Sequence, residues 1–408
     1  MTQADRTRLR ELAKKQLEIA NSPENQARVA LWRRHHKFQG ERPPIHIELG
    51  TFEKEIIEPL LVCEGAEARG LERKMLCLFT NQELFGDDRA VPDYLPVHQQ
   101  CHMQLFGCTI GRTMAKDSIG HQFQHVVHDL KEDFAVFEEE SNLLIIPGIS
   151  DEYRAEMADL LGDILPIKCV MNSLGASPTQ HVVHMMGMEH MFFAMYDYPD
   201  LFKRMMDRIA EEYVRYFKLL ESEKALLPTD GCEGLTQGSF CFWDPPENPN
   251  DLKTTDLWGY LDSQETVGLS PEMFHEFIFP AYQKIAAVYG RLSYGCCEPV
   301  DTFWDDLQTL GNLKKVSISP WCNEEFMAQQ LRGKDIIYYR KPSPNYLGVG
   351  EILDEDGFRA HIAHTIKTAR GCHLEIAQRD VYTVSRSPAK VRRYVEIIRE
   401  EIDRHWQE

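Results

Sequence analysis

Several features that define common protein classes are missing from this sequence. No stretch approaches 18 consecutive apolar residues, and the opening Met1-Thr-Gln-Ala-Asp-Arg6 has no apolar signal-peptide core. We therefore expect a cytoplasmic protein with no membrane segment. Basic residues are also outnumbered, with 45 Lys and Arg against 64 Asp and Glu and a net charge of -19. Because nucleic acids and anionic membranes select basic surfaces, we expect a small molecule or another protein as partner.

Two sequence motifs are also absent. The 11 cysteines are scattered without a Cys-x-x-Cys pair, which argues against a zinc ribbon or a thioredoxin-type site, and most should be reduced and buried. No Gly-x-Gly-x-x-Gly follows a predicted strand, so a dinucleotide-binding fold is disfavoured. Any metal site must therefore collect its ligands from separate strands.

The second half of the chain alternates regularly between strand and helix patterns. Strands are predicted at 291–296, 314–319, 335–339 and 373–377, with helices at 302–311, 323–332 and 351–370 and a final helix carrying Val391 and Ile398. Such alternation with short loops indicates parallel strands joined by crossover helices. In a chain long enough to bury a large core, we predict an α/β fold of the (β/α)8 TIM-barrel type with extra N-terminal helices. A doubly wound open sheet is the alternative.

The first half begins with helices and one strand. Residues 4–36 look helical with a break at Asn21-Ser-Pro23, and 43–49 alternates as a first strand that ends at Gly50. We interpret Arg33-Arg-His-His36 as a solvated helix end. The predicted organisation is an N-terminal helical extension at 1–40 and a single barrel domain at 41–408, with insertions around 63–140 and 228–256.

Histidines and turn residues mark the middle of the chain. His121, His125 and His128 have spacings of 4 and 3, which would place them near one helix face. A zinc site there is conceivable, but locally hydrogen-bonded histidines fit better because no His-Glu-x-x-His is present. A strand is predicted at 163–171, and Ser177-Pro178 then reads as the start of a helix that carries His181.

In a barrel, side chains that follow the strands gather at one mouth. The richest such segment is Tyr294-Gly-Cys-Cys-Glu298, in which Pro299 ends the strand. Cys296 and Cys297 could bind zinc, although adjacent residues point to opposite sides of a strand, so at most one faces the mouth. The other residues expected at the mouth are Glu48, His181, Asp262, Gln264, Trp321, Arg340, Lys341, Glu375 and Asp380.

Arg340 and Lys341 carry the positive charge at this mouth. They could clamp a carboxylate or a phosphate, the arginine as a fork and the lysine as a point charge. Equally, they could pair with neighbouring acids on this acidic protein. The sequence leaves both readings open.

Three segments between 256 and 404 carry recognisable motifs. The first is Leu269-Ser-Pro-Glu-Met-Phe-His-Glu-Phe-Ile-Phe-Pro280, the second runs from Ser293 to Val300, and the third is Ser387-Pro-Ala-Lys-Val-Arg-Arg-Tyr-Val-Glu-Ile-Ile-Arg-Glu400. In their order and spacing they resemble the uroporphyrinogen decarboxylase superfamily, which includes zinc-dependent methyltransferases of corrinoid systems. The family has a Ser-Pro-Glu-x-Phe helix, a strand ending in His-x-Cys-Gly and a closing helix at these three places.

The departures from the family pattern are informative. True decarboxylases have an Arg-Gln-Ala-Gly-Arg-Tyr segment after the first strand, whereas this chain has Ile47-Glu-Leu-Gly-Thr-Phe-Glu53, so a tetrapyrrole substrate is disfavoured. The methyltransferases hold zinc with His-x-Cys and a later cysteine. Here Tyr294 stands at the histidine position and Cys296 at the first cysteine. The resemblance then implies Cys296 or Cys297 with Glu375 or Asp380 as metal ligands.

The resemblance implies a methyltransferase of a corrinoid-dependent system. It would move a methyl group between a small methoxylated or methylated compound and a corrinoid carried by a partner protein, with zinc assistance, and family habit suggests a homodimer. Asp262, Tyr294 and Glu298 are the candidate catalytic residues. The candidate substrate-binding residues are Glu48, His181, Gln264, Trp321, Arg340 and Lys341. The alternatives are a metal-free decarboxylase or lyase and a non-catalytic binding protein on the same barrel.

Overall fold

A parallel β-sheet with helices around it forms the framework of this protein. The computed structural model describes residues 1–114 and 120–406. Seven strands pair in the order β1-β13-β12-β11-β10-β9-β8, and every neighbouring pair is parallel. They are β1 (Ile45–Ile47), β8 (Leu174–Ala176), β9 (Trp258–Leu261), β10 (Arg291–Tyr294), β11 (Leu313–Ile318), β12 (Ile337–Arg340) and β13 (His373–Gln378). The predicted alternation from residue 256 onward is confirmed.

A further parallel pair extends this strand order. β2 (Leu95–His98) pairs with β7 (Ile167–Val170), and only residues 171–173 separate β7 from β8. Counting β7 and β8 as one interrupted strand gives eight parallel positions, as the barrel prediction requires. The mixed α/β arrangement is therefore barrel-like. Within residues 1–114 and 120–406, however, no strand pairing joins β2 to β1, so closure of the barrel is not confirmed.

Two antiparallel strand pairs belong to the insertion at 63–140 and its surroundings. β3 (Gln100–Gln104) pairs with β6 (Asn142–Ile146), and β4 (Gly111–Met114) pairs with β5 (His121–Gln124). The helix predicted from the spacing of the histidines is therefore wrong, because its first residues form β5 and His125 and His128 follow in a loop. The spacing of three polar residues is too weak a signal to outweigh strand pairing.

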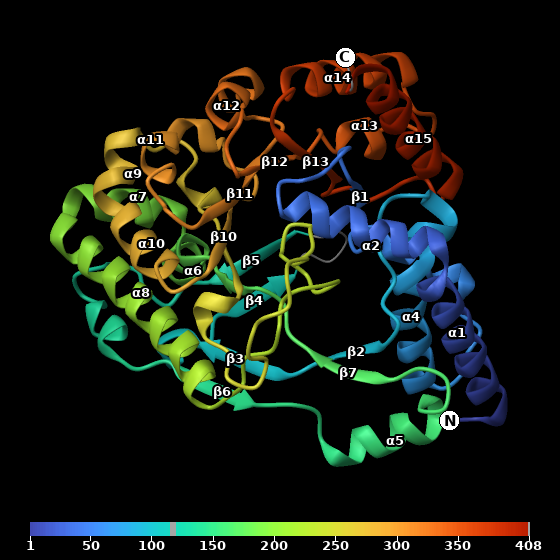
Figure 1. Cartoon of the computed structure of the whole chain (residues 1–408). Coiled ribbons are helices and arrows are strands. Elements are labelled where there is room, and N and C mark those ends of the chain that lie inside the picture. The colour runs from blue at the N-terminus through green and yellow to red at the C-terminus, as the bar shows by residue number, and fades with distance from the viewer. Residues whose placement is uncertain (115–119, 407–408) are drawn as a thin grey trace.

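The helices cover the outside of the sheet. Figure 1 shows α9 to α12 beside β10 and β11, and α14 and α15 beyond β13. The bounds are α1 (Gln3–Asn21), α2 (Pro23–His36), α3 (Glu53–Ile56), α4 (Ala66–Thr80), α5 (Asp151–Leu161), α6 (Pro178–Met186), α7 (Met188–Asp197), α8 (Pro199–Ser222), α9 (Pro271–Phe277), α10 (Phe279–Ala286), α11 (Trp304–Leu307), α12 (Glu324–Leu331), α13 (Asn345–Gly348), α14 (Glu355–Thr368) and α15 (Pro388–His405). None of these described helices combines the length and the apolar character that crossing a lipid bilayer would need.

Local chemistry explains several of the helix boundaries. Ser22 ends α1 and caps α2, accepting a hydrogen bond from the Asn25 N–H at 3.1 Å, and Pro23 occupies the first turn. Ser270 caps α9 in the same way through the Met273 N–H. The predicted break near residues 21–23 and the predicted helix start at 270 are therefore confirmed.

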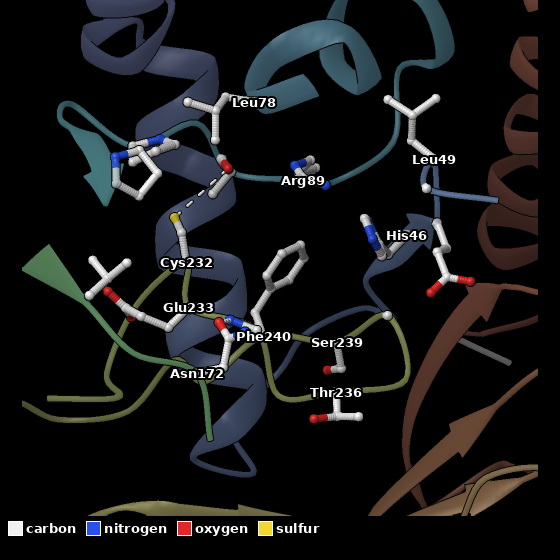
Figure 2. A pocket seen from close by; sticks show the side chains of 18 of the residues that line it. His46, Leu49, Leu78, Arg89, Asn172, Cys232, Glu233, Thr236, Ser239 and Phe240 are labelled. Carbon is white, nitrogen blue, oxygen red and sulfur yellow. Dashed lines mark hydrogen bonds between the residues drawn. The ribbon is translucent and has the colours of Figure 1, made fainter. Parts of the chain in front are cut away.

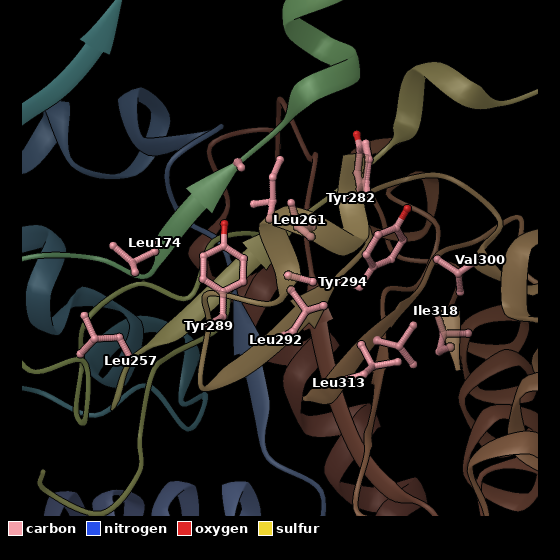
Figure 3. Close-up of a cluster of buried hydrophobic side chains, with 14 of the residues drawn as sticks. Leu174, Leu257, Leu261, Tyr282, Tyr289, Leu292, Tyr294, Val300, Leu313 and Ile318 are labelled. Carbon is pink, nitrogen blue, oxygen red and sulfur yellow. The ribbon is translucent and has the colours of Figure 1, made fainter. Parts of the chain in front are cut away.

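The core between sheet and helices is built from strand residues that are buried on both faces. Leu261, Leu292 and Leu313 come from the neighbouring strands β9, β10 and β11, and Tyr282 of α10 packs near them (Figure 3). All four residues of β9 and of β12 are buried. Continuous burial of this kind is expected where helices and inserted loops cover both faces of a parallel sheet.

The end of α2 differs from the sequence interpretation. Arg33 and Arg34 are exposed, but His35 and His36 are buried, with 2% and 0% of their surfaces accessible. The prediction that this helix end lies in solvent is therefore wrong for the two histidines. His36 Nε2 lies 3.0 Å from Lys315 Nζ of β11, so the helix end enters the space that the strands surround.

Candidate functional site

A hairpin at residues 232–240 fills part of the space inside the sheet. Gly234 and Phe240 form an antiparallel bridge, and the turn between them places Thr236, Gln237 and Gly238 at φ values of 64°, 55° and 77°. Three successive left-handed residues, two of them not glycine, are costly for a backbone and are typical of constrained functional loops. The hairpin is anchored where it meets the strands, because the Tyr339 hydroxyl donates to the Gln237 carbonyl.

The thiol pair lies against this hairpin at the end of β10. Gly295, at φ 101°, turns the chain out of the strand, and a Cβ there would lie only 3.0 Å from Ser317 and Val300 side chains. The Cys296 thiol donates to Gln237 Oε1 at 3.1 Å, and the two sulfurs are 3.6 Å apart. Both thiols therefore face the same cluster, contrary to the alternation expected of an unbroken strand.

Two cations lie beside the thiols. Lys341 Nζ donates to the Cys296 carbonyl at 2.9 Å and to Gln237 Oε1 at 3.2 Å. Arg379 also donates to Gln237 Oε1 and forms an ion pair with Glu48 at 3.0 Å. The hydrogen bond with Cys296, together with Lys341 and Arg379, lowers the pKa of the Cys297 thiol below its ordinary value. The same hydrogen bond and burial raise the pKa of Cys296, so Cys297 is the thiol that ionises first.

Two carboxyl groups complete the cluster. Burial and the charge of Asp262 raise the pKa of Glu298 to about 7, although its oxygens accept the N–H groups of Ser263 and Cys296. Burial also raises the pKa of Asp262. The Tyr260 hydroxyl donates to Asp262 Oδ2 at 2.9 Å, and the nearby Ser177 side chain also lowers the pKa of this carboxyl, whereas Oδ1 is buried and accepts no hydrogen bond of ordinary geometry among the described residues.

A second group of charges lies deeper, on the other side of the hairpin turn. Lys315 Nζ is 2.6 Å from Glu375 Oε2, and His35 Nε2 is 3.3 Å from the same oxygen. The Ser239 hydroxyl donates to Glu375 Oε1 at 2.6 Å and accepts from Lys315. Burial would raise the pKa of Glu375, but Lys315 and His35 outweigh it and hold that pKa far below its ordinary value. All four side chains are inaccessible or nearly so.

The structure brings together seven of the residues expected at the mouth. Cys296, Cys297 and Glu298 follow β10, and Cys297 Sγ is 3.9 Å from Asp380 Oδ2. Arg379 links this group to Glu48. The members are Glu48, Asp262, Cys296, Cys297, Glu298, Lys341 and Asp380.

The other expected residues lie elsewhere. Trp321 has 66% of its surface exposed. Arg340 forms an ion pair with Glu324 of α12 at 2.5 Å, so it pairs with a neighbouring acid, which is the second of the two roles that the sequence left open for it. The Tyr294 hydroxyl bonds to Ser263 Oγ at 2.6 Å inside the core. Glu375 belongs to the deeper group.

His181 and Gln264 are also placed apart from the thiols. The His181 ring lies 5.9 Å from that of Tyr213, and burial lowers the pKa of His181 to about 4. Gln264 donates to its neighbour Glu265 at 3.1 Å. Both belong to the α6 side of the molecule, where Thr179 also bonds to Glu265.

The residues near the thiols do not fit the zinc site that the resemblance implies. Cys296, at 3.6 Å between the sulfurs, and Asp380, at 3.9 Å, are the ligand types nearest to Cys297, but Lys341 and Arg379 add two positive charges beside them. Among residues 1–114 and 120–406 no three His, Cys, Asp or Glu side chains are arranged to hold a metal ion. We therefore assign no chemical step to zinc.

Sequence reasoning did not identify the residues that connect the two groups. Gln237 contacts Cys296, Lys341 and Arg379, yet it lies in the segment around 228–256 that the sequence predicts only as an insertion. For Lys315 the sequence pattern predicts only a place in the strand at 314–319. The one available signal was composition, because a lysine in an apolar strand and a Thr-Gln-Gly turn are both unusual in those positions.

Comparisons with known proteins give a likeness of fold. No protein-family model matches the chain, and no curated protein matches it. A solved methyltransferase from Methanosarcina mazei matches with a TM-score of 0.50 and 13% identity, over 91% of this chain and 98% of that one. A B12-independent methionine synthase from Shewanella sp. W3-18-1, solved with selenomethionine, matches over 84% and 92% of the two chains at 11% identity and a TM-score of 0.33, which is too low to carry an argument. The first match extends over nearly the whole of both chains, so the two proteins share their overall α/β fold.

Proposed function

We propose that this protein is a methyltransferase whose reaction takes place at the strand ends of β9, β10, β12 and β13. The proposal is supported by three sequence segments that resemble the uroporphyrinogen decarboxylase superfamily and by the fold shared with a protein described as a methyltransferase. The single observation that carries it is the pair of buried carboxyl groups of Asp262 and Glu298, whose pKa values are both raised. One oxygen of this pair, Asp262 Oδ1, accepts no hydrogen bond of ordinary geometry among the described residues.

The chemical difficulty in demethylating an ether is its leaving group. When a methyl–oxygen bond breaks, the electron pair stays on oxygen, and protonation of that oxygen makes it a better leaving group. Asp262 in its protonated form can supply this proton from Oδ1, because Oδ2 is held by Tyr260. Burial keeps the pKa of Asp262 high, and Glu298, whose oxygens accept hydrogen bonds from backbone N–H groups, acts as a positioning residue beside it.

The methyl acceptor lies outside this chain in our proposal. The resemblance suggests a corrinoid carried by a partner protein, which would supply the nucleophile that takes the methyl group. Within this chain, Lys341 and Arg379 favour the ionised form of Cys297, and they also partly offset the effect of burial on the pKa of Asp262.

The test is a methyl-transfer assay with the purified full-length protein. Incubation with a panel of methoxylated aromatic compounds and free cob(I)alamin should produce the absorbance change of methylcobalamin for at least one compound. A parallel reaction without protein gives the background rate. If no compound raises the rate above that background with free cob(I)alamin or with a corrinoid protein, the proposal fails.

The paired cations favour a second candidate, a decarboxylase. Lys341 and Arg379 converge on Gln237 Oε1 and could instead hold a substrate carboxylate. This candidate predicts release of carbon dioxide without any corrinoid. Measuring carbon dioxide and methylcobalamin in the same reactions separates the two functions.

A further inference from the structure

A cavity of about 470 Å³ lies between β1, β2, β7 and the hairpin at residues 232–240. It occupies the place where the described strands do not pair, between β1 and β2. His46 of β1 and Glu48, which follows the strand, lie on the same face by strand alternation, and both line the cavity. Figure 2 shows His46 on its wall. Its volume is in the range of pockets that hold small organic ligands.

One positive charge on the cavity wall has no counterpart. Arg89 lines the cavity with its guanidinium carbon 5.7 Å from the Phe240 ring centre. Throughout residues 1–114 and 120–406, no carboxylate pairs with Arg89 and no hydrogen bond from its side chain is present. The neighbouring Asp88 is already bound by Arg42 and Arg399. A half-buried guanidinium with five free donors is a recognition group for carboxylates and phosphates.

A histidine beside Arg89 is also held ready for a ligand. His46 packs its ring 4.8 Å from that of Phe240, and its Nδ1 lies 3.4 Å from Asp87 Oδ2. Asp87 is fixed by the N–H of Ile47 and the amide of Asn81. This orientation directs Nε2 of His46 away from Asp87, and no described side chain or backbone group bonds to Nε2.

The acids on the wall cannot neutralise Arg89 because they are already paired. Glu233 accepts from the Tyr94 hydroxyl at 3.1 Å and from the Gly231 N–H at 2.8 Å, and Lys168 lies 3.5 Å away. Glu48 is paired with Arg379. The wall therefore carries one unmatched positive charge, which favours a singly charged ligand over the more highly charged phosphate.

We propose that this cavity binds a small organic monocarboxylate with a flat apolar body. The carboxylate lies on Arg89, the flat body lies against Phe240, and His46 Nε2 provides a second polar contact. Gln237 is shared with the thiol and carboxyl cluster, since this residue lines the cavity and its Oε1 accepts a hydrogen bond from Cys296. If the ligand is also the substrate for methyl transfer, it is a methoxylated monocarboxylate, and this part of the inference rests on the proposed function. The binding of a monocarboxylate in the cavity does not depend on that function.

The binding experiment uses three probes of similar size or charge. Isothermal titration of the full-length protein with benzoate, benzamide and inorganic phosphate should give saturable binding of benzoate and at least about tenfold weaker binding of the other two, since a charge-assisted bond is lost or mismatched. Equal binding of benzoate and benzamide, tighter binding of phosphate, or no saturable benzoate binding would each overturn the proposal.

Variants locate the site. Arg89→Gln should weaken benzoate binding about ten- to a hundredfold, whereas Arg154→Gln, at an exposed arginine of α5, should leave it unchanged. Leu78→Phe, which adds bulk to the cavity wall without altering charge, should also weaken binding. Equal affinities in Arg89→Gln and Arg154→Gln, with matching melting temperatures, would place the ligand elsewhere.

The outcome is independent of the methyl-transfer assay. Benzoate binding that depends on Arg89, with no methyl transfer to a corrinoid, would refute the proposed function and keep the ligand class. Methyl transfer from neutral ethers that is unaffected by Arg89→Gln would keep the proposed function and refute a monocarboxylate as its substrate class.

Discussion

Two buried charge clusters lie inside the same sheet and are built in opposite ways. In the deeper one, Lys315 and Glu375 are paired at 2.6 Å, and the carboxylate has a strongly lowered pKa. At the mouth, neither Asp262 nor Glu298 forms an ion pair within residues 1–114 and 120–406, and burial raises the pKa of both although Lys341 and Arg379 lie near Asp262. A paired buried charge holds two strands together, whereas unpaired carboxyl groups are costly and persist where chemistry needs them.

The largest expected effect tests the deeper cluster. Lys315→Met leaves Glu375 buried without its main partner and should lower the free energy of unfolding by about 3–5 kcal/mol, measured by urea denaturation. The double variant Lys315→Met/Glu375→Leu removes both charges and should recover most of that loss. A single variant costing less than about 1 kcal/mol would show that the pair is not a structural link.

The second prediction tests the mouth. Asp262→Asn should reduce kcat for methyl transfer by about 10²- to 10⁴-fold, because the amide cannot donate an acidic proton. Its free energy of unfolding should stay the same or rise, since a buried carboxyl group is removed. Asp251→Asn, in an exposed loop, is the control and should keep full activity. If Asp262→Asn lost stability and kept its kcat, Asp262 would have a structural role like that of the deeper cluster, and the proposed difference between the two clusters would be wrong.

The pH dependence of stability sharpens the same contrast. Glu298 has a pKa of about 7 in the folded protein and 4.5 ordinarily, so the folded state binds its proton more tightly. Stability from this group is full below about pH 4.5 and is lost as the pH rises through 7. Glu298→Gln removes the effect, so the variant should gain up to about 3 kcal/mol relative to the parent between pH 5 and 8. Urea denaturation at several pH values measures it, and a constant difference would contradict it.

The smallest expected effect concerns the thiols. At pH 7 iodoacetamide should modify Cys297 about tenfold faster than Cys296, because the lowered pKa leaves more of Cys297 as thiolate. Lys341→Gln should slow the labelling of Cys297. Peptide mass spectrometry over time gives both rates, and faster labelling of Cys296 would reverse the assignment.

Sequence periodicity was enough to predict the second half of the fold. Strands β10 to β13 and their helices carry local patterns, and the strand-end rule led directly to Cys296, Glu298 and Asp262. These predictions succeed because each depends on a few adjacent residues. The interrupted strand β7/β8, and the absence of a β1–β2 pairing in the part of the chain that the structure describes, depend on contacts between distant segments, which periodicity does not report.

The least predictable residues are those that act across the sheet. His36 and Lys315 meet from α2 and β11, and Gln237 reaches Arg379 from a loop 142 positions away in sequence. Polar residues in such clusters look locally like surface residues, so the sequence interpretation placed His35 and His36 in solvent. Only the folded chain reveals that their partners are buried with them.

The hairpin at residues 232–240 also bears on how such a protein can diversify. One short continuous segment carries Gln237, which borders the thiol cluster and the cavity, and Ser239, which bonds to the deeper ion pair. Its replacement would reshape ligand choice and reactivity together without altering any strand of the scaffold. Divergence among proteins of this architecture can therefore be concentrated in nine residues, and a hairpin exchange between homologues is the natural route to engineering a new specificity.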